Sequence, residues 1–97
     1  MPEYFRQVVR ERRFEDELRG LIAESIAADQ FVEAAEFLIA RDPLIGSETE
    51  DPRVWAMPMA LVDGAQVVLY YTFDDSTVWL LSISRISNEH STGPNAL

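Results

Sequence analysis

The stretch that most constrains the fold is VVLYYTFDDSTVWLLSI, residues 67–83. Two runs rich in β-branched and aromatic residues flank the short polar segment Asp74-Asp75-Ser76-Thr77, a pattern typical of an antiparallel hairpin. Because successive side chains of a strand point to opposite faces of a sheet, unbroken apolar runs put apolar side chains on both faces. One face must pack on the rest of the chain. The other face needs a separate explanation.

The first half of the chain shows helical patterning. Apolar residues recur at helical spacing over residues 14–28 and 30–41, with polar residues between them, so we expect a helical hairpin there, its second helix capped by Asp29. The second helix ends at Asp42-Pro43, because proline cannot continue a helix. The segment that follows, up to residue 53, is rich in proline and acidic residues and predicts a loop.

The two ends of the chain differ in character. Residues 4–10 fit either a backward extension of the first helix or a separate strand, and their aromatic and β-branched content favours the strand. Residues 87–97 are polar and contain glycine and proline, so we expect a loose tail.

Three antiparallel strands in a meander are expected in the second half, over residues 54–61, 66–73 and 77–86. A two-residue turn at Asp63-Gly64 would require a backbone N–H from Pro58, which has none. We therefore expect a four-residue loop over residues 62–65, which leaves Pro58 at a non-bonded position. The chain as a whole, residues 1–97, predicts one α+β domain.

This register gives the meander two apolar faces. One face carries Trp55, Met57, Met59, Leu61, Val68, Tyr70, Trp79, Leu81 and Ile83. The other carries Val54, Ala56, Ala60, Val67, Leu69, Tyr71, Phe73, Val78 and Leu80. Two amphipathic helices cover only about one face, so the uncovered face is expected to bind a partner, or a second copy when the protein is isolated.

Which face binds the partner stays open at this point. Met and Trp are common at binding surfaces, which favours the first face as the interface, yet the bulk of the same residues suits a core. The candidate partner-binding residues are Trp55, Met57, Met59, Tyr70, Trp79 and Leu81.

Composition narrows the possible functions. The net charge is −9 and all eight basic residues are arginine, so a phosphate backbone should repel the chain and no direct DNA binding is expected. Cysteine is absent, which excludes disulfides, thiolate metal sites and a cysteine nucleophile. The spacing of the loop acids does not fit a calcium site, and we expect neither metal nor cofactor. Without a secretory signal or a membrane-length apolar run, a cytoplasmic location is expected.

Three segments carry a resemblance to a known family: FEDELRGL at residues 14–21, AAEFLIARDPLIG at 34–46 and VVLYYTFDDSTVWLLSI at 67–83. In this order they resemble the RelE/ParE toxin superfamily over roughly residues 4–86. The resemblance implies a bacterial toxin-like, plasmid-stabilising domain that a cognate antitoxin wraps and neutralises. It also implies one of two activities, ribosome-dependent cleavage of messenger RNA or, in the ParE branch, inhibition of DNA gyrase.

The resemblance points to few catalytic residues. The ribonuclease branch gathers lysines and arginines on its sheet, whereas this chain has no lysine; its matching positions are Arg85, His90 and Arg53. An arginine can stabilise a pentacovalent phosphate, and a histidine can move protons near neutral pH. Arg85 can equally be a surface residue and His90 part of the tail. The acidic charge favours a ParE-like protein-binding function; the alternatives are a RelE-type endoribonuclease and a non-toxic homodimer of the same fold.

Overall fold

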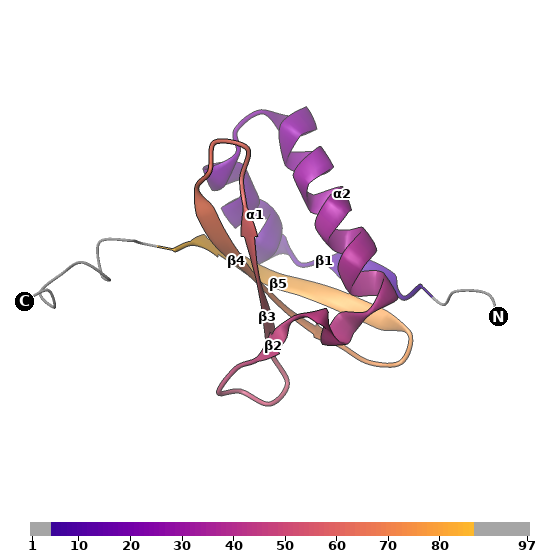
Figure 1. Cartoon of the computed structure of the whole chain (residues 1–97). Coiled ribbons are helices and arrows are strands. Elements are labelled where there is room, and N and C mark those ends of the chain that lie inside the picture. The colour runs from indigo at the N-terminus through magenta and orange to yellow at the C-terminus, as the bar shows by residue number, and fades with distance from the viewer. Residues whose placement is uncertain (1–4, 87–97) are drawn as a thin grey trace, which may run out of the picture.

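A computed structural model describes residues 5–86, which form one mixed sheet with two helices. Figure 1 shows the arrangement. The elements, in chain order, are β1 (Gln7–Arg10), α1 (Arg12–Leu21), α2 (Ser25–Arg41), the 3-10 helix η1 (Pro43–Ile45), β2 (Ser47–Glu48), β3 (Trp55–Ala60), β4 (Gln66–Phe73) and β5 (Thr77–Arg85). The predicted α+β class is confirmed, and so is the presence of a strand, rather than a helix, near the N-terminus.

The sheet has five strands in the order β1-β5-β4-β3-β2, and β1 runs parallel to β5. The prediction of a three-stranded antiparallel meander was therefore incomplete. β1 pairs with the outer edge of β5 and so joins the sheet. Backbone hydrogen bonds run from Gln7 N to Ser76 O (2.9 Å) and from Glu11 N to Leu80 O (3.0 Å). β2 forms inside the predicted loop; two residues are too short to show a periodic pattern.

The helices begin and end at other residues than expected. The predicted helix over residues 14–28 is broken, because the chain leaves helical geometry after α1 and starts again at α2. The carboxylate of Glu24 accepts hydrogen bonds from Ile26 N (3.2 Å) and Ala27 N (2.8 Å). These bonds satisfy two of the unpaired N–H groups of the first turn. Glu24, and not Asp29, is thus the cap of the second helix.

Both helices lie on the same side of the sheet (Figure 1), where their apolar residues share one core with the strands. The buried members of this core are Phe14, Leu18, Ala28, Val32, Ala35, Ile39, Met57, Leu61, Val67, Leu69, Tyr71, Val78, Leu80 and Ile83. The prediction that the helices cover a single face is confirmed.

The β3–β4 loop is shorter than expected and sets the register of the sheet. Leu61 N donates to Ala65 O (2.8 Å) and Gly64 N donates to Leu61 O (2.9 Å), so the loop has three residues and the expected four-residue loop was wrong. Gly64 has a φ of +90°, a conformation that glycine adopts without steric cost. Pro58 still occupies a non-bonded position, opposite Val68.

This register changes which residues share a face. Met57 lies opposite Leu69 and Met59 opposite Val67, so the methionines join the core face and not the face of Tyr70. The two predicted face sets were mixed, because moving the strand pairing by one residue exchanges the faces of one strand.

A bulge in β5 produces the second exchange. Tyr70 pairs with Ser82 and Tyr71 pairs with Leu80, which leaves Leu81 as an extra residue on β5. An extra residue reverses the alternation beyond it. Leu80 is therefore buried on the same face as Ile83, although the sequence pattern had placed them on opposite faces.

Tyr71 fastens the segment after α2 to the sheet. Its hydroxyl donates to Pro43 O (2.6 Å) and accepts from Gly46 N (3.1 Å). Burial raises the pKa of this phenol, against the opposing effect of the Gly46 hydrogen bond. The neutral hydroxyl thus joins β4 to the chain that leads into β2.

Gly46 is the position where a single methyl group should weaken this joint. A Cβ at Gly46 would lie 2.5 Å from the Tyr71 hydroxyl and 2.7 Å from Ala56 O. We expect Gly46→Ala to lower the free energy of unfolding by about 1 to 3 kcal/mol, measured by urea denaturation. The matched control, Gly20→Ala, has nothing within 4 Å of its new methyl group and should leave stability unchanged or raise it by up to about 1 kcal/mol. Equal effects of the two substitutions would contradict the packing described.

Candidate partner-binding face

The side of the sheet opposite the helices carries a row of apolar residues that no element within residues 5–86 covers. We call it the open face and define it by Val9, Val68, Tyr70, Trp79 and Leu81, all of which are partly exposed. Val9 lies opposite Trp79 across the β1–β5 pair. The open face therefore extends across three neighbouring strands.

The strand residues of the open face are uncharged. Between the apolar side chains lie only small or hydroxylated residues, with Thr72 opposite Trp79 and Ala56 opposite Tyr70. At one margin, the β2–β3 loop borders a shallow hollow of about 260 Å³, lined by Asp51, Arg53, Val54, Thr72 and Leu81; its two charged residues pair with each other. In a chain with net charge −9, an uncharged face that contains Tyr and Trp has the composition of an interface core.

The six predicted partner-binding residues do not share one face. Tyr70, Trp79 and Leu81 lie on the open face. Met57 is buried, with 6 % of its surface exposed, while Trp55 and Met59 are half-buried against the core. Trp55 packs edge to face on Phe73, with ring centroids 5.8 Å apart.

The bulge beside the open face is held by a carboxylate. Beyond the end of β1, no described strand pairs with this edge of β5, and Glu17 of α1 occupies the position of a neighbouring strand. Its Oε1 accepts from Ser82 Oγ (2.7 Å) and from Ile83 N (3.0 Å), and its Oε2 accepts from Arg13 Nε (3.1 Å). The carboxylate thus supplies the acceptor that a neighbouring strand would have offered.

These contacts change the acidity of Glu17. Partial burial raises its pKa, but the hydrogen bonds from Ser82, Ile83 and Arg13 lower it by more, so the net pKa lies below the ordinary value of 4.5. The carboxylate is therefore ionised at neutral pH and remains so in mild acid.

Two arginines near the N-terminus, Arg10 and Arg13, are paired with acidic residues of the helices. Arg10 Nε lies 2.7 Å from Glu36 Oε2, and Arg10 Nη1 lies 3.5 Å from Asp29 Oδ1. The hydrogen bond to Glu36 is the main cause that raises the pKa of Arg10, while partial burial opposes it. This arginine ties β1 to α2 and serves the fold.

The predicted catalytic residues do not form a described cluster. Arg85 is exposed at the end of β5, opposite Val67, and His90 lies outside the described residues. Arg53 pairs with Asp51 at 3.2 Å and lies near Thr72, five positions along β4 from Val67. Val67 lies on the core face, whereas Thr72 lies on the opposite face beside Trp79, so the described strands do not bring Arg53 and Arg85 together.

Residues 5–86 contain neither a candidate metal site nor a membrane-spanning helix. No group of three or more His, Cys, Asp or Glu side chains in this range could hold a metal ion. No helix in the same range is long and apolar enough to cross a membrane.

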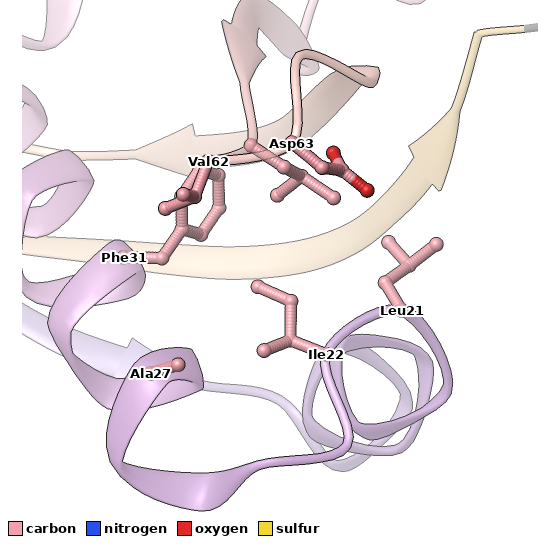
Figure 2. Close-up of a pocket in the computed structure, with 7 residues that line it drawn as sticks. Leu21, Ile22, Ala27, Phe31, Val62 and Asp63 are labelled. Carbon is pink, nitrogen blue, oxygen red and sulfur yellow. The ribbon is translucent and has the colours of Figure 1, made fainter.

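Sequence reasoning missed an apolar pocket at the end of the molecule where the α1–α2 connection faces the β3–β4 loop (Figure 2). Its lining combines segments about 40 residues apart, Leu21 to Phe31 and Leu61 to Asp63. The sequence offered one local signal of this pocket, namely the apolar residue Val62 within the expected loop. In the structure Val62 lies at the loop tip and is fully exposed.

Comparison with known proteins gives no match. No protein-family model matches the chain, and none of the curated proteins does. The resemblance to the RelE/ParE superfamily therefore depends on the three sequence segments that suggested it.

The Glu17 contacts predict a pH dependence of stability. Because the folded pKa of Glu17 lies below the unfolded one, its contribution is complete above the unfolded pKa and disappears as the pH falls through the folded pKa. We expect Glu17→Gln to lower the free energy of unfolding at pH 7, and the difference from wild type to shrink as the pH falls below about 4.5. The control Glu33→Gln, on the exposed side of α2, should show no such trend. A wild-type advantage of constant size from pH 7 to pH 3 would disprove this role of Glu17.

Proposed function

We propose that this chain is the toxin-like component of a bacterial toxin–antitoxin system and acts in the cytoplasm by binding protein, as in the ParE branch. The observation that carries the proposal is the open face, with Tyr70, Trp79 and Leu81 on an uncharged surface. Aromatic residues on such a surface are the kind that dominate binding energy. The assignment to the toxin–antitoxin class rests on the sequence resemblance to the RelE/ParE superfamily.

The electrostatic balance supports protein binding over RNA cleavage. A nuclease must hold a polyanion, and affinity for a phosphate backbone comes mainly from lysine and arginine. Here the net charge is −9, lysine is absent, and within residues 5–86 two of the eight arginines, Arg10 and Arg13, are paired with acids on the helices. The ribosome-dependent ribonuclease remains the alternative that experiment must test.

In the cell, an antitoxin segment would cover the open face. When the protein is purified alone, a second copy would cover it, because two uncharged faces can meet without bringing like charges together. The third interpretation, a non-toxic homodimer of the same fold, shares this interface and differs only in having no effect on a host.

The interface is tested by a charged substitution on the open face. We expect the isolated protein to sediment as a dimer at tens of micromolar, and Leu81→Arg to weaken the dimer at least tenfold, because an unpaired charge would be buried. The matched control is Leu38→Arg on α2, where the leucine is 41 % exposed and lies off the open face; it should leave the dimer intact. Circular dichroism establishes that both variants are folded. A dimer that survives Leu81→Arg would overturn the assignment.

The mode of action is tested by induced expression in a bacterial host. We expect growth arrest that Leu81→Arg reduces and that Arg85→Ala and His90→Ala leave largely unchanged, since the proposed activity does not use these groups. Transcript mapping and a gyrase supercoiling assay identify the target. Ribosome-dependent cleavage that is lost in either Arg85→Ala or His90→Ala would instead establish the ribonuclease, and growth without arrest would establish the non-toxic dimer.

A further inference from the structure

A pocket lined mainly by apolar residues lies between the helices and the β3–β4 loop, outside the open face. Figure 2 shows apolar side chains from the end of α1, the start of α2 and the loop pointing into one space, with the Asp63 carboxylate beside it. The pocket measures about 240 Å³ and its lining residues are Leu21, Ile22, Ala27, Phe31, Leu61, Val62 and Asp63.

The size of the pocket limits its ligand. Sites for cofactors and drug-sized molecules usually measure roughly 300 to 1,000 Å³, and this pocket lies below that range. One large apolar side chain is a better match, as in the anchor pockets of protein interfaces, where a single buried residue supplies much of the binding energy.

The lining of the pocket also favours a ligand that carries a positive charge. Asp63 is the one polar residue of the lining. Its Oδ1 accepts from Ala65 N (2.9 Å), which fixes the carboxylate at the pocket. The overall charge of −9 reinforces the preference for a cation next to the anchoring side chain.

The surroundings of the pocket are also apolar and exposed. Val62, at the loop tip, is fully exposed, and Ile26, one residue before Ala27, is 65 % exposed. Large exposed apolar residues around an apolar pocket indicate a surface that a protein partner covers.

We infer that this pocket is a second docking site, which receives a leucine-sized or aromatic side chain of a partner protein whose neighbouring arginine or lysine pairs with Asp63. The inference rests on the proposed function, since the partner would be the antitoxin that covers the open face in the cell, and not a second copy of this chain. Leu61 belongs to the core side of the sheet, so the two sites lie on opposite sides. The edge of β3 lies between the two sites, and β2 pairs there only with Trp55 and Ala56, which leaves a path for a partner that occupies both.

The pocket is tested with two short probes that need no knowledge of the natural partner. Acetyl-leucyl-arginine amide and acetyl-leucyl-glutamate amide are titrated into the full-length protein while its methyl NMR signals are recorded. We expect the arginine probe to shift the methyl signals of Leu21, Ile22, Leu61 and Val62 with a dissociation constant in the millimolar range. The glutamate probe should bind about fivefold or more weakly.

Three variants assign the binding to the pocket. Ala27→Met fills the space and should abolish the shifts, whereas Ala34→Met, at an exposed alanine of the same helix, should retain them. Asp63→Asn keeps the acceptor for Ala65 N and removes only the charge, so the two probes should bind equally. No shifts at 50 mM probe, or equal binding to Ala27→Met, would overturn the inference. Neither result depends on Leu81, so failure here is distinguishable from failure of the open face.

Discussion

Two short helices can cover one face of a sheet, and most of this structure follows from that limit. α1 and α2 supply six of the buried core residues, and all of them pack on the same side of the strands. The other side has no element of the described chain above it. Its strand residues are uncharged, and runs of apolar residues at consecutive positions are the pattern of strands that are buried on both faces. We therefore propose that something other than this domain's own helices covers the second face.

Two single positions, Gly64 and Leu81, determine which residues lie on the open face. Gly64 takes a φ of +90° and closes the β3–β4 loop after three residues, which brings Met57 and Met59 to the core side. The extra residue Leu81 then exchanges the faces of the first half of β5. Both events move the pairing by one residue, and one residue is enough to exchange the faces.

The sequence predicts the elements better than their pairing, and the reason is physical. Periodicity reports how many residues lie between buried positions within one element, so the helical hairpin, the three long strands and even the short strand before α1 could be predicted. Loop lengths and bulges depend on the backbone conformation of several neighbouring residues, and periodicity within one element carries no information about it. The prediction of four loop residues instead of three was wrong for this reason. Hence Tyr70, Trp79 and Leu81 are on the open face as one set, while Met57 of the same predicted group is in the core.

Long-range features were beyond the sequence pattern altogether. Glu17 caps the edge of β5 from a helix 65 residues earlier in the chain, and only the fold brings them together. The same holds for the pocket, whose lining joins the ends of the helices to a loop. Each feature consists of ordinary residues that carry no motif, and the absence of matching protein families leaves their geometry as the basis for proposing what they bind.

The central claim is that the open face is an interface, and the solvent exposure of Trp79 provides its most direct test. Trp79 lies on the open face, whereas Trp55 packs on the core side. Hydroxyl-radical footprinting of the isolated protein, at below one micromolar and at tens of micromolar, should show Trp79 and Tyr70 protected at the higher concentration, with Phe37 of α2, 52 % exposed, equally modified at both. Equal modification of Trp79 at the two concentrations, in a protein that sediments as a monomer at both, would contradict the account.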